Sequence, residues 1–145
     1  MEENVISAAP AFKLYKDRSI SMATFLGGPL VAGYLTADNF KKLGQSRKAG
    51  ITWLISITFT LLMIAIIFLI PELENIPNYV IPLFYTAVTQ TVVQKLQGPA
   101  IEAHIDAGGQ TYSSWRAAGI GLLGLLILTL LIILIVLLLD ESAFQ

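Results

Sequence analysis

The stretch TFLGGPLVAGYLTADNF, from Thr24 to Phe40, decides the fold of this chain. It is apolar enough to enter a membrane, yet Gly27, Gly28 and Pro29 interrupt it where a spanning helix should be most regular. Glycine weakens a helix, and proline removes a backbone donor and restricts the residue before it. We therefore expect this segment to enter the membrane, break at the GGP sequence and turn back to the face it left.

The composition is that of a membrane protein. The 145 residues are 55% hydrophobic and only 13% charged, whereas a soluble domain has about a quarter charged residues. Three or four spans of roughly 20 apolar residues would use most of the chain. We expect an all-α, polytopic membrane helix bundle that forms a single domain over residues 1–145. The chain has no cysteine, which excludes disulfides, iron–sulfur clusters and thiolate zinc sites.

Three segments are predicted to span the bilayer, over residues 51–70, 76–94 and 117–139. The first and the last are uncharged, strongly apolar and of sufficient length. The middle one is uncharged but contains proline, threonine and glutamine, so we expect a kink near Pro82 and packing against neighbouring helices. A half-buried surface segment is the alternative for this middle stretch.

The charges are segregated by loop, which predicts the orientation. The link 71–75 and the tail 140–145 contain acidic residues and no Lys or Arg. Cytoplasmic loops collect Lys and Arg. If residues 20–37 turn back, all nine cations lie on one side; if they cross, six lie on one side and three on the other. We therefore predict three spans, a re-entrant or interfacial unit over residues 13–50, a cytoplasmic N-terminus and a C-terminus on the other side. A kinked fourth span is the alternative.

A second Gly-Pro step suggests an internal repeat. Gly98 and Pro99 precede a short segment, a glycine pair and a long span, in the same order as after Gly28 and Pro29. The pattern predicts a parallel repeat, with a short amphipathic cytoplasmic helix over residues 98–108. Coincidence between two linkers near the membrane is the alternative.

One cluster has acid–base potential. Glu102, His104 and Asp106 are close in sequence, but on a helix His104 points nearly opposite to the two carboxylates. Metal ligation or general-base catalysis needs the three to converge, as they would on a strand. We interpret them as a solvated helix face and assign no catalytic residue, metal or cofactor.

The predicted spans contain hydrogen-bonding stripes but no ionisable residue, which argues against an ion-coupled transporter. Such stripes usually join helices, although they can also line a polar path. Ala117 and Gly121 permit close helix approach, within the chain or between copies. The stripes are formed by Thr52, Ser56 and Thr60 in the first span and by Thr86, Gln90 and Gln94 in the second.

The segment from Tyr15 to Gly44 resembles the N-terminal signature of an uncharacterised family of small bacterial multi-pass membrane proteins. The signature contains T-F-x-G-G-P, then a tyrosine and an Asn-Phe pair. Lys16 and Asp17 stand where the family would have Ser-Pro. The resemblance implies a bacterial inner membrane and no known reaction. The matching residues are Tyr15, Ile20, Thr24, Phe25, Gly27, Gly28, Pro29, Tyr34, Asn39 and Phe40.

These observations lead to a functional hypothesis. We expect a non-enzymatic assembly subunit of the membrane, with a platform at the cytoplasmic leaflet. Its partners would be the lipid bilayer and a membrane protein or copies of itself, without nucleic acid. The first alternative is a small oligomeric channel or transporter in which the stripe that contains Gln90 lines the path. The second is an enzyme that acts on lipid through Glu102, His104 and Asp106.

Overall fold

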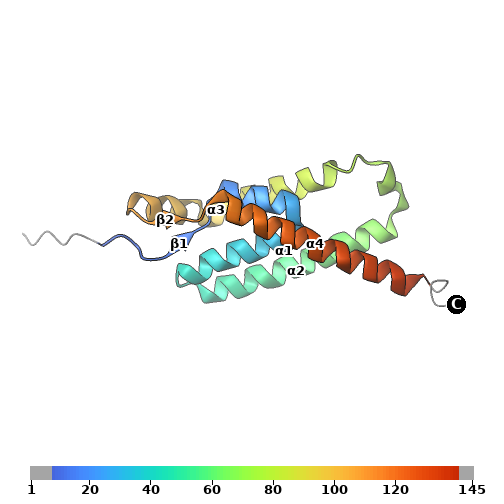
Figure 1. The fold of residues 1–145 in the computed structure, drawn as a ribbon, viewed down its shortest axis with the longest axis horizontal. Helices are drawn as coiled ribbons and strands as arrows, with labels where there is room; N and C mark the ends of the chain where they lie inside the picture. The colour runs from blue at the N-terminus through green and yellow to red at the C-terminus, as the bar shows by residue number, and fades with distance from the viewer. Residues whose placement is uncertain (1–7, 141–145) are drawn as a thin grey trace, which may run out of the picture.

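The computed structural model describes residues 8–140, and nearly all of them are helical (Figure 1). The predicted all-α class is confirmed. By length and composition, three of the four long helices could cross a membrane: α1, α2 and α4. The elements are β1 (Lys13–Leu14), α1 (Asp17–Lys42), α2 (Ser46–Leu69), the 3-10 helix η1 (Pro71–Asn75), α3 (Val80–Asp106), β2 (Gln110–Thr111) and α4 (Ser114–Leu139).

Helix α1 is a hairpin that reverses at Gly28. The backbone angles of Gly28 are φ 78° and ψ −173°, a combination open essentially to glycine alone. The Tyr15 N–H donates to Asn39 Oδ1 at 2.8 Å, although a continuous helix would separate these residues by about 36 Å. Figure 1 shows the two halves of α1 running out and back. The break predicted at GGP is therefore confirmed.

The α1 hairpin is the centre of the bundle. Helices α2, α3 and α4 each pack extensively against α1 but hardly touch one another. In its most apolar window α1 is 67% buried, whereas the corresponding window of α4 has no buried residue. The apolar outer surfaces of α2 and α4 are thus left for lipid or for another protein.

Glycines set the close crossing of α1 and α4. A Cβ atom on Gly27 would lie 2.5 Å from the backbone oxygen of Gly121, and one on Gly121 would lie 2.8 Å from that of Ala23. Ala117 is completely buried in the same contact surface of α4. The close approach predicted at Ala117 and Gly121 therefore occurs within the chain.

Helix α3 differs from its prediction in two ways. The prediction of a kink near Pro82 is wrong. Pro82 lies in the first turn of α3, where a missing N–H costs no helical hydrogen bond. The separate helix over residues 98–108 was also wrong, because α3 continues through Gly98 and Pro99 to Asp106. Gln97 and Ile101 are buried on either side of this step, and their packing keeps the helix in line.

The other bounds are close to those expected. Helix α2 starts at Ser46 instead of residue 51, and α4 starts at Ser114 instead of 117. The predicted middle span lies in α3, which runs the length of the bundle in Figure 1 but is not among the three helices that meet the span criteria. Because one Gly-Pro step reverses the chain and the other does not, the predicted repeat is absent from the fold described for residues 8–140. Residues 141–145, the end of the predicted outer tail, lie outside the described residues.

Candidate functional site

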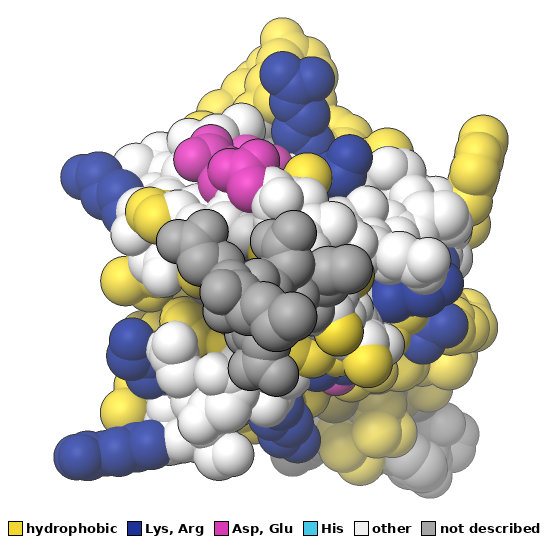
Figure 2. Space-filling view, turned by 90° about the vertical axis from the view of Figure 1, so that its left-hand side faces the viewer, with side chains coloured by type: hydrophobic (Ala, Val, Ile, Leu, Met, Phe, Trp, Pro, Cys, Tyr) yellow, Lys and Arg dark blue, Asp and Glu magenta, His cyan; other side chains and the backbone are white. Residues whose placement is uncertain are grey.

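All nine Lys and Arg residues gather toward one end of the bundle, which we call the basic end. The N-terminal approach to α1, the α1–α2 turn and the α3–α4 loop meet there (Figure 1). Figure 2 looks onto this end and shows Lys and Arg side chains around a face that also has a cluster of acidic ones. Glu72, Glu74 and Asp140 belong to the opposite end. The basic residues are Lys13, Lys16, Arg18, Lys41, Lys42, Arg47, Lys48, Lys95 and Arg116.

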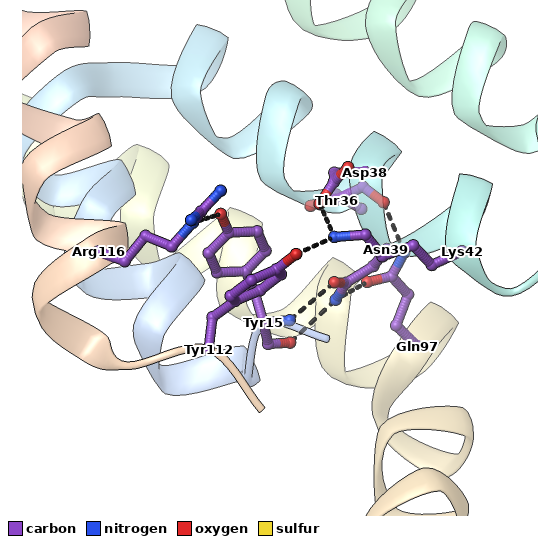
Figure 3. A network of polar contacts seen from close by, with 8 residues as sticks. All are labelled: Tyr15, Thr36, Asp38, Asn39, Lys42, Gln97, Tyr112 and Arg116. Atoms are coloured by element: carbon purple, nitrogen blue, oxygen red, sulfur yellow. Dashed lines mark hydrogen bonds and ion pairs between the residues drawn. The ribbon is translucent and has the colours of Figure 1, made fainter. Parts of the chain in front are cut away.

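Asn39 closes the hairpin at the basic end. Its side chain is fully buried, its Oδ1 accepts from the Tyr15 N–H at 2.8 Å, and its Nδ2 donates to the Tyr15 carbonyl at 2.9 Å. The same Nδ2 donates to Gln97 Oε1 at 3.2 Å, and Gln97 Nε2 donates to the Thr36 carbonyl at 2.8 Å. These bonds join the start of the hairpin, its returning half and α3 (Figure 3).

Two tyrosines and two cations form a layer next to Asn39 (Figure 3). The rings of Tyr15 and Tyr112 have centroids 4.5 Å apart, and Arg116 Nε donates to the Tyr15 hydroxyl at 3.0 Å. Lys42 Nζ lies 4.3 Å and Arg116 Cζ 4.5 Å from the centroid of the Tyr112 ring. Such cation–π contacts stabilise both charges at the end of the bundle.

Lys42 is the most constrained cation of this layer. Its Nζ lies 2.6 Å from Asp38 Oδ2 and donates to the Tyr112 hydroxyl at 2.7 Å. Burial works to lower the pKa of Lys42, but the hydrogen bonds to Asp38 and Tyr112 outweigh it and raise the pKa above its ordinary 10.5. Lys42 therefore connects α1 to the α3–α4 loop through its ion pair with Asp38 and its hydrogen bond to Tyr112.

The acid–base cluster does not converge. His104 is buried, stacks on Phe12 with centroids 4.9 Å apart, and donates through Nε2 to the Gln110 carbonyl at 2.9 Å. Glu102 and Asp106 are exposed. The opposite faces predicted for a helix are confirmed, but the prediction of a solvated face is wrong for His104, which is buried. Within residues 8–140 no three His, Asp or Glu side chains are grouped to hold a metal. His104 instead fastens β2 to the end of α3.

The stripe on α3 faces α1. Gln94 Nε2 donates to Asp17 Oδ2 at 3.2 Å, Gln90 is partly buried one turn away, and the Thr86 hydroxyl is buried without a partner in the described part of the chain. A path lined by this stripe would thus have to pass along α1. On α2, Thr60 donates to its own helix, and Ser56 contacts Gly33 of α1.

Sequence reasoning singled out Asn39, Gly27, Gly28, Pro29 and Gly121, and Tyr15 through the signature, but missed Gln97, the other partner of Asn39. Gly98 and Pro99 have no special backbone role, because they continue α3. Gln97 was not noticed, although a signal was present. It shares a helical face with three other residues that the structure buries: Val93, Ile101 and His104.

Comparison with known proteins adds no relative. No family model, curated protein or solved structure matches the chain. The resembled signature nevertheless has a physical explanation in this fold, because its residues build the hairpin. Gly28 makes the turn, Gly27 allows α4 to approach, and Tyr15 and Asn39 join the two ends.

Proposed function

We propose that this chain is a multi-pass protein of a bacterial inner membrane in which α2, α3 and α4 span and the α1 hairpin re-enters. The segregation of charge supports this orientation, since all Lys and Arg gather at the basic end and cytoplasmic regions collect such residues. The N-terminus is then cytoplasmic and the C-terminus periplasmic. Each half of α1, about 18–21 Å long, is shorter than the roughly 30 Å hydrocarbon core.

The role that fits this architecture best is that of a non-enzymatic assembly subunit. This role is supported by a platform at the basic end, which we define as β1, β2 and the end of α3 from residue 98 to 106. The parallel pairing of Lys13 with Gln110 and the contacts of His104 with Gln110 and Phe12 join the segments of this platform to one another. The hydrogen-bonding groups of the Asn39 network point inward, whereas charges of both signs point outward.

The outward charges suggest the kind of partner. Glu102 and Asp106 are exposed on the platform. Figure 2 shows that the face of the basic end carries acidic side chains together with Lys and Arg side chains. Mixed charge patterns fix orientation and register between partners more than they add affinity. A second copy of this chain, or a membrane protein with a complementary pattern, meets that requirement.

Site-specific crosslinking in native membranes tests the platform. A photo-reactive residue at Asp106 should give a crosslinked species of defined mass, whereas one at Glu74, at the opposite end, should give none. Crosslinks of equal yield from both positions would indicate random collisions. A single monomeric species in mild detergent, together with no crosslink from Asp106, would sink the assembly role.

The orientation is tested separately by cysteine labelling, because the chain has no native cysteine. With an impermeant reagent on intact cells, Lys13→Cys and Arg47→Cys should both be protected and Asn75→Cys should react. If the first two differ from one another, α1 crosses the membrane and the four-span alternative replaces the hairpin. This result is independent of any partner.

A further inference from the structure

A cleft opens between α2 and α3, where these two helices pack against α1 and hardly contact one another. Its volume is about 200 Å³, and the returning half of α1 forms its floor. Most of the lining is apolar, and Thr52 donates its hydroxyl to the Lys48 carbonyl within α2. The lining includes Ala32 and Gly33 of α1, Ile55 and Phe59 of α2, and Val88 and Val92 of α3.

The cleft and its charged mouth together span about one leaflet. Phe59, the α2 lining residue farthest from Lys48, is 11 positions beyond it, which corresponds to about 16 Å of helix. Half of the hydrocarbon core is about 15 Å thick. Lys48, at the basic end, and Phe59, at the end of the α2 lining, are therefore separated by about the depth of one leaflet.

Two cations stand at the surface end of this cleft. Lys48 precedes Thr52 by four positions, so it extends the lining face of α2 by one turn. Its Nζ lies 5.8 Å from the ring centroid of Phe40, the residue one turn beyond Thr36 on the floor. Lys95 directly precedes the lining residue Leu96 on α3, and both lysines are exposed.

An unsatisfied acceptor lies at the same end. Gln45 Oε1 is buried without a partner in the described residues, and the Gln45 N–H donates to the Phe40 carbonyl at 2.8 Å. A buried acceptor of this kind costs free energy until a donor reaches it. A hydroxyl or amine of a bound lipid headgroup would supply such a donor.

We propose that this cleft binds one anionic phospholipid of the cytoplasmic leaflet. An acyl chain lies along the α1 floor, and the headgroup phosphate lies between Lys48 and Lys95. The apolar lining suits the chain, the length fits one leaflet, and the charge at the mouth is complementary to the phosphate. The choice of leaflet rests on the proposed orientation, whereas binding itself does not.

The test is native mass spectrometry of the full chain with equal amounts of dioleoyl phosphatidylglycerol and dioleoyl phosphatidylcholine. One phosphatidylglycerol should be retained in about thirtyfold preference, since each of the two cations contributes on the order of 1 kcal/mol near a surface. Lys48→Gln with Lys95→Gln should bring the preference close to parity. Val88→Trp, at a lining residue that is 42% exposed, should reduce retention of both lipids.

The matched control removes the same charge elsewhere at the basic end. Lys41→Gln with Arg47→Gln should keep the preference, because both positions lie on helix faces turned away from the lining. Equal losses in the two double variants would show general attraction of lipid to a basic surface and would overturn the site. Retention unaffected by Val88→Trp, or a dimer that Val88→Trp abolishes, would overturn it as well. The labelling results at Arg47 and Asn75 decide the leaflet independently.

Discussion

The two Gly-Pro steps of this chain have the same sequence and opposite structures. At Gly28 and Pro29 the helix breaks and the chain reverses, whereas at Gly98 and Pro99 helix α3 continues. Gly28 adopts a positive φ of 78°, and Gly98 is not among the glycines with positive φ. A Gly-Pro step therefore permits a reversal but does not impose one.

The surroundings of each step explain the difference. Around Gly28, both halves of α1 have small or apolar side chains that the other helices bury, so folding back buries both. Around Gly98, the buried residues Gln97, Ile101 and His104 follow a single helical face, which a break would misalign. Tertiary contacts on both sides select the conformation, and in α3 they outweigh the lost helical hydrogen bond and the crowding that Pro99 introduces.

We expect the largest loss of stability at Asn39, whose side chain joins the two ends of the α1 hairpin. Asn39→Ala removes three buried hydrogen bonds and leaves the Tyr15 N–H, the Tyr15 carbonyl and Gln97 Oε1 without that partner. We expect a loss of about 3–5 kcal/mol, since each buried group left unpaired costs about 1–3 kcal/mol. Denaturant unfolding in detergent micelles, followed by circular dichroism, measures it.

Gln94 provides the control for Asn39, because it is an exposed amide whose side chain donates a single surface hydrogen bond, to Asp17 Oδ2 at 3.2 Å, within the described part of the chain. Gln94→Ala should cost well below 1 kcal/mol, in the range of surface polar contacts. If both variants unfold alike, the hairpin does not depend on the buried network.

The second prediction compares the two steps directly. Gly28→Ala forces an alanine into a backbone conformation that L residues rarely adopt, and we expect a loss of about 2 kcal/mol. Gly98→Ala should instead stabilise by up to about 1 kcal/mol, because alanine is the better helix former and a Cβ there meets open space. Thermal unfolding of the two variants under identical conditions checks the opposite signs; a shift of the same sign would contradict our account.

The third prediction concerns the close packing of α4 against the α1 hairpin. Gly121→Ala places a methyl group against the Ala23 backbone and should cost about 1–2 kcal/mol by overpacking. Gly119→Ala, two positions earlier in the same helix, meets nothing within 4 Å. Gly119→Ala should leave the unfolding midpoint unchanged or slightly higher. Unfolding midpoints that match for the two variants would mean that the crossing can relax at little cost.

The sequence predicted the reversal because its evidence was redundant. GGP is incompatible with a regular helix, and the distribution of Lys and Arg favours a return to the same side independently. At Gly98 only the local pattern was available, and it was misleading. The length of α3 depends on tertiary contacts such as those of His104 with Phe12 and Gln110, and a single sequence does not reveal them directly.

The candidate site was predictable only in part. Asn39 stood out through the resembled signature, but its partner Gln97 is distant in sequence and of a residue type that is usually exposed. The Tyr15–Tyr112–Arg116 layer depends on the α3–α4 loop returning to the start of α1, which two-residue strands bring about. Such short pairings have no detectable sequence pattern. The glycine face of α4 was predictable, since close helix packing requires small residues.

The smallest predicted effect concerns Lys42, the last residue of the returning half of α1. Hydrogen bonds to Asp38 and Tyr112 raise the Lys42 pKa above 10.5 despite the opposing effect of burial. A raised pKa in the folded state means that the stabilisation is complete below the unfolded pKa, about 10.4, and is lost as the pH rises through the folded value. Lys42→Met should therefore cost less than about 1 kcal/mol at pH 8, as for an ion pair near the protein surface. The difference in unfolding free energy from the wild type should disappear above about pH 11. Chemical unfolding of both proteins from pH 8 to 11.5 measures this difference in unfolding free energy. The titration of the other lysines and tyrosines affects both proteins alike and therefore cancels in the difference. A difference independent of pH would show that Lys42 acts by packing and not by charge.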